Sequence, residues 1–355
     1  MRHIRLLHLE NMSPLESQAV YHAVAYAMTD DTPDTILLVS PDAPYICIGY
    51  HQDLDKEVDV EYAARAGLPI YRREVGGGAV YLDNGQLFTQ WVFHPNALPA
   101  ALDERFALYI KPLVETYQAL GIPAYHRPIN DIHVGGKKIG GTGAAQMGRA
   151  EVVVGSLMFT FDKKTMARVL NVSSEKMRDK IFESLEQYMT TMTEQLGITP
   201  ERRAVTELYV QKCAAALHAE MVPGELSDAE RAMLRELDAR FVSDEWLRQK
   251  GGLRQIGVKI HEDVRVVEGA FKAPGGLIRV TARLREGRID DISLSGDFTL
   301  LPAFAVGALE QAARGLRAAR ETLAPRFDDV YRALHIQSPG VTPENFVEAI
   351  VNAAA

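Results

Sequence analysis

Up to residue 161 the chain alternates between short apolar runs, typical of strands, and segments with the apolar spacing of an amphipathic helix. After an initial strand, a capping box with proline at the first helical position, Ser13-Pro14-Leu15-Glu16, begins a helix that continues through Met28. Further strands are predicted at 35–39, 45–48, 68–73, 79–82, 87–93 and 152–161, and further helices at 58–66 and 103–120. This order predicts an α+β (mixed α/β) fold with much antiparallel pairing.

The pattern changes twice in the second half of the chain. From 163 to 240 it is nearly all helical, and after the run Lys250-Gly251-Gly252 it returns to alternating strands. Those strands are predicted at 257–260, 264–271, 277–284 and 289–294, with helices near 301–323 and at 343–353. Because 355 residues exceed what one hydrophobic core usually serves, we predict two domains, a larger one at 1–249 and a smaller α+β domain at 250–355.

Charge and cysteine content narrow the functional classes. The net charge of −8, from 39 basic and 47 acidic residues, gives no support for nucleic-acid binding and argues against membrane attachment. No charged-then-apolar leader opens the sequence and no apolar run reaches the length of a bilayer. The only cysteines, Cys47 and Cys213, fit a reducing compartment. We therefore predict a cytoplasmic protein.

The first candidate for chemistry is an arginine pair followed by three glycines. Arg72-Arg73-Glu74-Val75-Gly76-Gly77-Gly78 places guanidinium groups beside main chain that is too small to obstruct a ligand. Bare main-chain N–H groups approach an anion closely, and the guanidinium supplies charge that does not titrate away. This segment predicts a site for phosphate or carboxylate.

The second candidate is a hairpin around Gly135-Gly136. Two glycines between short apolar and polar runs predict a two-residue primed turn, which pairs Val134 with Lys137, His133 with Lys138 and Ile132 with Ile139. Period-two alternation then directs the side chains of Asp131, His133 and Lys138 to one face of the sheet. Lys138 is therefore the lysine that we expect among ionisable neighbours.

Together these segments resemble the lipoate-protein ligases of the biotin and lipoate protein ligase superfamily. In that family Arg-Arg-x-Ser-Gly-Gly-Gly-Ala-Val-(aromatic)-His-Asp is followed by Asn-Asp and by Lys-(apolar)-(small)-Gly, which match 72–83, 130–131 and 138–141. Ile48-Gly49-Tyr50-His51-Gln52-Asp53 is similar to an earlier family segment, and Gly296-Asp297-Phe298 resembles one in the family's accessory domain. The resemblance implies a ligase-like catalytic domain at 1–249 and an accessory domain at 250–355.

The resemblance also implies an ATP-dependent reaction in two steps. Lipoate attacks the α-phosphate of ATP, which enters with Mg²⁺, and the resulting lipoyl-AMP is taken by a lysine of an acceptor protein. The implied acceptors carry a lipoyl domain: a 2-oxoacid dehydrogenase E2, the glycine cleavage H protein or a related lipoate-binding protein. No permanent cofactor is implied.

The family's functional residues carry over to positions that match its motifs. Lys138 matches the central catalytic lysine, which contacts the acyl carboxyl and the phosphate, and Arg73 matches the nucleotide-binding arginine. The stretch implied to bind ATP or lipoyl-AMP is Gly76, Gly77, Gly78, Ala79, Val80 and Tyr81. Asn130 and Asp131 match the pair beside the adenylate, and Asp131 is also the candidate ligand for magnesium.

Several positions depart from the family pattern. Glu74 and Val75 stand where a small residue and serine are usual, Leu82 replaces histidine, Gln86 replaces asparagine, and Val154 lies near another common histidine. These changes leave two alternatives open: an ATP-independent transferase of octanoyl or lipoyl groups, and a non-catalytic binder of lipoylated domains. Related octanoyltransferases use a cysteine nucleophile after the lysine segment, and this chain has no cysteine between Cys47 and Cys213. A biotin ligase is a weaker alternative.

Two neighbours of these motifs have simpler explanations. Arg72 alternates to the face opposite Arg73, so we expect a surface ion pair there. His133 has no second histidine at a metal-ligand spacing, and we expect a hydrogen-bonded strand residue.

Overall fold

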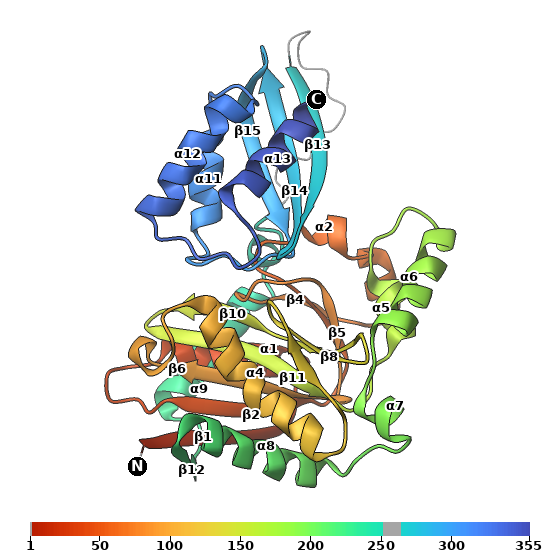
Figure 1. Cartoon of the computed structure of the whole chain (residues 1–355), viewed down its shortest axis with the longest axis vertical. Coiled ribbons are helices and arrows are strands. Elements are labelled where there is room, and N and C mark those ends of the chain that lie inside the picture. Colours follow the sequence, from red (N-terminus) through yellow and green to blue (C-terminus); the bar gives the residue numbers. More distant parts are fainter. Residues whose placement is uncertain (1, 251–263) are drawn as a thin grey trace. The chain divides into compact units, whose positions relative to one another are not determined.

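The computed structural model describes residues 2–250 and 264–355 and divides into two compact units (Figure 1). Unit 1 comprises Met1–Cys47, Val58–Arg73 and Val80–Ser243. Unit 2 comprises Asp244–Ala355 together with two short segments from earlier in the chain, Ile48–Glu57 and Glu74–Ala79. The predicted boundary at 249/250 stays a prediction, because most of the predicted linker and the predicted strand 257–260 lie outside the described residues.

Unit 1 is built on a six-stranded mixed sheet. The strand order is β10 (Gly143–Met147), β11 (Ala150–Met158), β6 (Gln86–Phe93), β2 (Thr35–Pro41), β1 (Arg2–Met12) and β12 (Ala219–Pro223). β1 pairs in parallel with β2 and β12, whereas the other pairs are antiparallel. β2 and β6 are buried along their whole length, which is why both read as nearly continuous apolar runs in the sequence.

Four helices of 13 to 18 residues pack around this sheet. They are α1 (Pro14–Tyr26), α4 (Leu102–Ala119), α8 (Arg202–Leu217) and α9 (Asp228–Phe241). Trp91 of β6 donates its indole N–H to the hydroxyl of Tyr209 on α8, at 3.2 Å. α1 packs against α9, where the ring centroids of His22 and Phe241 lie 4.8 Å apart. The other α-helices of the unit are α3 (Val60–Arg65), α5 (Lys163–Val169), α6 (Glu175–Tyr188) and α7 (Met192–Leu196).

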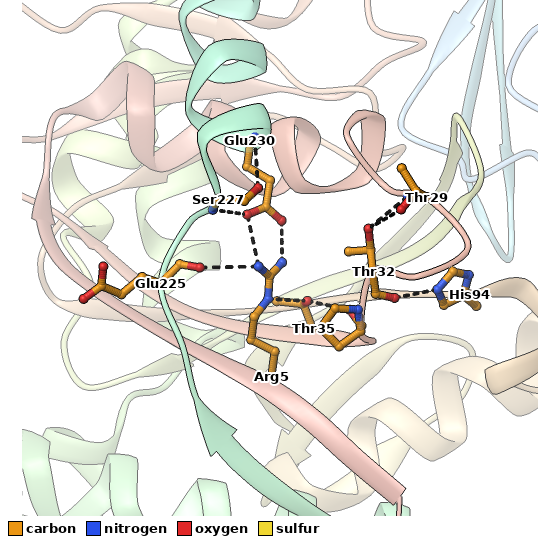
Figure 2. Close-up of polar contacts among 9 residues, drawn as sticks. Arg5, Thr29, Thr32, Thr35, His94, Glu225, Ser227 and Glu230 are labelled. Atoms are coloured by element: carbon orange, nitrogen blue, oxygen red, sulfur yellow. Dashed lines mark hydrogen bonds and ion pairs between the residues drawn. The ribbon is translucent and has the colours of Figure 1, made fainter.

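A polar network ties the start of unit 1 to its last long helix (Figure 2). Arg5 of β1 donates from Nε to Oγ1 of Thr35 at 3.1 Å and from Nη1 to Oε2 of Glu230 at 3.1 Å. Glu230 also accepts a hydrogen bond from the main-chain N–H of Ser227 at 2.7 Å, as part of the capping box of α9. One carboxylate thus caps α9 and neutralises the arginine that joins β1 to β2.

Two three-stranded sheets carry the sequence motifs. One has the order β4 (Ile70–Arg72), β3 (Tyr45–Ile48), β5 (Val80–Leu82), and the other has the order β7 (Tyr125–Arg127), β8 (Asp131–Val134), β9 (Lys137–Gly141).

In unit 2 an antiparallel meander of β13 (Val264–Ala273), β14 (Gly276–Arg285) and β15 (Arg288–Gly296) packs against three helices. These are α11 (Ala305–Ala313), α12 (Arg320–Ala333) and α13 (Pro343–Ala354), and two short helices, α2 (Leu54–Glu57) and α10 (Asp244–Leu247), also belong to this unit. Its core is formed by alternate strand residues such as Val280 and Leu294 together with Phe327 and Phe346 of the helices.

The mixed α/β class and most strands agree with prediction, while three regions differ. The predicted helical region near 301–323 is two helices, separated at Gly315, whose φ is 78°, and α12 continues to Ala333. β12 lies inside the stretch predicted to be nearly all helical, because parallel pairing with β1 decides its conformation. β7 and β10 were not predicted. Across the described residues, no helix has the length and apolar character needed to cross a membrane.

Candidate active site

The Lys138 hairpin forms as the sequence predicts, apart from one bulge. Gly135 and Gly136 have φ values of 54° and 83°, as a primed turn requires. His133 pairs with Lys138 and Val134 with Lys137. The predicted pairing of Ile132 with Ile139 is wrong, because the register shifts after His133 and Ile132 pairs with Gly140 instead.

Lys138 points to the predicted face and meets Asp131 there. Its Nζ lies 2.6 Å from Oδ1 of Asp131, and the two side chains are 29% and 21% exposed. The lysine side chain extends over Gly141, where an added Cβ would come within 2.9 Å of Nζ. The glycine after the lysine therefore provides the space in which the ammonium reaches its carboxylate.

His133 is a hydrogen-bonded strand residue at the centre of this face, as predicted, and it is only 1% exposed. Its Nδ1 lies 3.3 Å from the carbonyl oxygen of Gly136 and its Nε2 lies 3.3 Å from Nη1 of Arg127. Burial lowers the pKa of His133, although the nearby Asp131 carboxylate opposes this effect. A neutral ring donates from Nδ1 and accepts at Nε2, which leaves Asp131 to pair with Lys138.

Arg73 lies just after β4, above a buried polar group. Its Nη1 donates to the carbonyl oxygen of Cys47 at 3.3 Å and lies 3.6 Å from the Cys47 sulfur. Beneath it, the Cys47 thiol contacts Oε1 of Gln18 at 3.2 Å, and Gln18 donates to the hydroxyl of Tyr21 at 2.9 Å. The two contacts with Cys47 fix the position of the Arg73 guanidinium.

The surface ion pair expected for Arg72 is wrong. The Arg72 side chain is completely buried and is among the largest fully buried side chains described. The side chain therefore lies in the interior rather than at the surface.

The three glycines of the candidate anion site belong to unit 2, where main chain packs closely against them. Gly77 donates its N–H to the carbonyl oxygen of Phe298 at 3.4 Å. A Cβ on Gly76 would lie 2.6 Å from that oxygen, whereas a Cβ on Gly78 would lie 3.7 Å from Cβ of Asp297. The Gly296-Asp297-Phe298 segment is thus the immediate neighbour of the glycine loop.

The remaining predicted site residues fall into the same structural groups. Val80 and Tyr81 lie in β5, opposite Cys47 and Ile46, and Ala79 ends the glycine segment of unit 2. Asn130 donates from Nδ2 to the carbonyl oxygen of Thr142. This hydrogen bond joins the residue before Asp131 to the residue that follows β9. One small sheet therefore carries Asp131 and Lys138, with Asn130 just before it, and the other carries Val80 and Tyr81, with Arg73 just after its strand β4. Their roles toward ligand stay predictions.

Residues 13–214 match the family model described as the lipoyl protein ligase A/B catalytic domain, which is more than half of the chain. The chain belongs to this family. It is 29% identical over 272 residues to the octanoyltransferase LipM of Kyrpidia tusciae, covering 69% of this chain and 98% of the relative. It is 28% identical over 258 residues to lipoate-protein ligase A subunit 1 of Thermoplasma acidophilum, covering 68% and 95%.

A solved structure extends the comparison. The bi-partite lipoate protein ligase of T. acidophilum, described with its E2 lipoyl domain, superposes with a TM-score of 0.65 and 25% sequence identity, covering 73% of this chain and 100% of that one. This family member is therefore an enzyme of the lipoate ligase and octanoyltransferase group, with a catalytic domain of the biotin/lipoate ligase type.

Both thiols of this family member are buried. Cys47 and Cys213 are 0% and 1% exposed. Burial raises the pKa of the Cys47 thiol, an effect that Arg73 partly opposes, and burial raises the pKa of Cys213 to about 12. Both side chains therefore stay protonated at neutral pH.

One residue beside Lys138 was missed from the sequence. Arg127 ends β7 directly opposite Asp131, on the face that carries His133 and Lys138. The sequence would have indicated Arg127 only through a third strand predicted before the hairpin. β7 has three residues, which are too few for a recognisable alternation of apolar and polar positions. Within the part of the chain that the structure describes, no group of three His, Cys, Asp or Glu residues is placed to hold a metal ion.

Proposed function

We propose that this family member is an ATP-dependent lipoate-protein ligase. In the first step a carboxylate oxygen of lipoate attacks the α-phosphorus of ATP, the bond to the β-phosphate breaks, and pyrophosphate leaves. In the second step a lysine amine of the acceptor attacks the acyl carbon of lipoyl-AMP, an amide forms, the amine loses a proton and AMP leaves.

The burial of both cysteines is the observation that supports a ligase over a transferase. A transferase of this group needs a thiolate that can reach the thioester of a carrier protein and hold the acyl group. Cys47 and Cys213 are buried, and burial keeps both protonated. Activation by ATP requires no enzyme nucleophile, so the reaction that fits this chain is adenylation.

The charged residues supply what adenylation needs. Two anions must approach each other, and negative charge builds up on the phosphoryl oxygens, so fixed cations and main-chain donors stabilise the transition state. We assign Lys138 to the acyl carboxyl and phosphate, Arg73 to the nucleotide, and residues 76–81 to contacts along the ATP. Asn130 and Asp131 would flank the adenylate.

Magnesium would enter bound to ATP as part of the substrate. Asp131 is the carboxylate beside Lys138 that would contact it; its Oδ1 makes the 2.6 Å ion pair, and its Oδ2 lies 3.7 Å from Nε2 of His133. The acceptor would be a lipoyl-domain protein, such as a 2-oxoacid dehydrogenase E2 or the glycine cleavage H protein. Consumption of ATP accords with the cytoplasmic location predicted from the sequence.

A second candidate is favoured by one specific finding, the 29% identity to an octanoyltransferase over 98% of that enzyme's length. It would move an octanoyl or lipoyl group between carrier proteins without ATP. A conformational opening that exposes Cys47 or Cys213 would be required for it.

The test uses purified full-length protein, an unmodified E2 lipoyl domain, lipoate, ATP and Mg²⁺, with the acceptor followed by intact mass. We expect acylation that depends on ATP and that persists in the cysteine-free variant Cys47→Ala/Cys213→Ala. The same reactions with octanoyl-acyl carrier protein as donor and no ATP serve as the opposing arm. If product forms only with octanoyl-acyl carrier protein, and the cysteine-free variant forms none, the protein is a transferase and not a ligase.

A further inference from the structure

Arg127 is an exposed arginine beside the ion pair of Lys138 and Asp131, and one edge of its guanidinium makes no hydrogen bond or ion pair with the described residues. Its Nη1 donates to Nε2 of His133 at 3.3 Å and to the hydroxyl of Tyr188 at 3.2 Å. Among residues 2–250 and 264–355, Nε and Nη2 of Arg127 have no hydrogen-bonding or ion-pair partner. Nε–H and Nη2–H form the parallel fork that binds a carboxylate or phosphate through two hydrogen bonds.

The elements around Arg127 fix it close to Lys138. Register places Arg127 opposite Asp131 in the β7–β8 pair, and Asp131 contacts Lys138 at 2.6 Å. Tyr188 is the last residue of α6, and the two residues that follow it contact the same hairpin. Met189 forms a bridge with Lys138, and Thr190 donates its N–H to the Lys138 carbonyl oxygen at 2.9 Å.

Two exposed tyrosines flank this arginine. Tyr125 lies two residues before it on the same face of β7, and the hydroxyl of Tyr188 accepts a hydrogen bond from Nη1 of Arg127. The two residues are 46% and 43% exposed, although most large apolar side chains described are buried or half-buried. Tyrosine and arginine are the residue types most enriched at the centres of protein interfaces. We call Tyr125, Arg127 and Tyr188 the Tyr-Arg-Tyr cluster.

We propose that the Tyr-Arg-Tyr cluster is the docking surface for the acceptor domain, and that Arg127 binds a carboxylate of that domain near its target lysine. This inference rests on the proposed function, since it places the acceptor on the face from which the incoming amine would reach an acyl group held at Lys138. Lys138 contacts Asp131 and, in the proposed reaction, the acyl carboxyl and phosphate, whereas Arg127 is an exposed cation of the same face to which the reaction assigns no part of the adenylate, so its charge is left for the acceptor.

A protein carboxylate fits this position better than a nucleotide phosphate. Transferring phosphoryl groups are stabilised best where water is excluded, whereas Arg127 is exposed between two exposed rings. A flat, exposed surface of aromatic rings around one fixed guanidinium matches an acidic protein surface. The experiment below distinguishes binding of an acceptor carboxylate at Arg127 from binding of a nucleotide phosphate there.

The experiment titrates an unmodified E2 lipoyl domain into full-length protein by calorimetry, without ATP. We expect Arg127→Gln to weaken binding about tenfold, as loss of a charge-assisted hydrogen-bonded pair does, with little recovery in Arg127→Lys because an ammonium lacks the fork. Tyr188→Phe removes only the hydroxyl that holds Nη1 and should weaken binding less. Arg203→Gln is the matched control, because Arg203 is an exposed arginine of α8 that pairs with Glu207.

Steady-state kinetics gives the second readout. The KM for the acceptor domain should rise in Arg127→Gln, while the KM for ATP and lipoate-dependent ATP–pyrophosphate exchange stay at wild-type values. Unchanged acceptor binding in Arg127→Gln overturns the docking surface, and so does a rise in the KM for ATP alone. Arg127-dependent binding in a protein that uses no ATP would leave the docking surface standing and refute the ligase.

Discussion

The Lys138 hairpin and the glycine loop use glycine in opposite ways. In the hairpin, Gly141 leaves room for a side chain, since an added Cβ would meet the flexible end of Lys138 at 2.9 Å. In the loop, Gly76 leaves room for main chain, since an added Cβ would meet the Phe298 carbonyl oxygen at 2.6 Å and Cα of Thr299 at 2.9 Å.

Because of this difference, we expect substitutions in the hairpin to affect mainly activity and substitutions in the loop to affect stability. A side chain such as Lys138 can shift when its space is reduced, so a change in the hairpin should alter chemistry before stability. The main chain at Phe298 and Thr299 cannot shift without disturbing the packing around it, so a change in the loop should alter stability as well. Each region therefore makes a distinct prediction.

The largest effect is expected for Lys138→Ala. It removes the ammonium assigned to the acyl carboxyl and phosphate, and loss of one such electrostatic contact costs about 10²–10³ in kcat. Lipoate-dependent ATP–pyrophosphate exchange measures the first step alone. An exchange rate equal to that of wild type in Lys138→Ala would show that Lys138 has no role in adenylation. Lys137→Ala, which changes the neighbouring lysine, is the matched control.

The next effect is expected for Gly76→Ala. The added methyl group would collide with main chain at Phe298 and Thr299, and such overpacking costs about 1–3 kcal/mol. Calorimetry should show a lower unfolding temperature than in Gly78→Ala, whose Cβ would stand at 3.7 Å from Asp297. Equal stability of the two variants would contradict the close packing of the loop against 296–299.

The smallest change in stability is expected for Gly141→Ala. Only the end of the Lys138 side chain has to move, so the unfolding free energy should change by less than about 1 kcal/mol. Adenylation should nevertheless fall, by about tenfold, because displacement of a positioned catalytic group by 1 Å is costly. A variant that loses stability but keeps its exchange rate would reverse the comparison between hairpin and loop.

The hairpin was predictable because its determinants are local. Two glycines in sequence fix the turn, and alternation then fixes which side chains meet, so the pairing of Asp131 with Lys138 followed from counting. The bulge was not predictable, since strict alternation and the two-residue turn both imply the unshifted pairing of Ile132 with Ile139.

The glycine loop shows the limit of the same reasoning. Its anion-binding composition could be read from Arg73 and the three glycines, but its neighbour, the 296–298 segment, comes from the far end of the chain. Arg72 failed for a related reason, because alternation gives the face of a strand and not what covers that face. Arg127 was missed because its role depends on contacts with His133 and Tyr188 across two other elements.

The most direct test of the central claim is a crystal structure of this protein with lipoyl-AMP. The account predicts one bound adenylate whose acyl-phosphate group contacts Nζ of Lys138 and whose nucleotide contacts the Arg73 guanidinium. An adenylate that leaves either Arg73 or Lys138 without contact would contradict it.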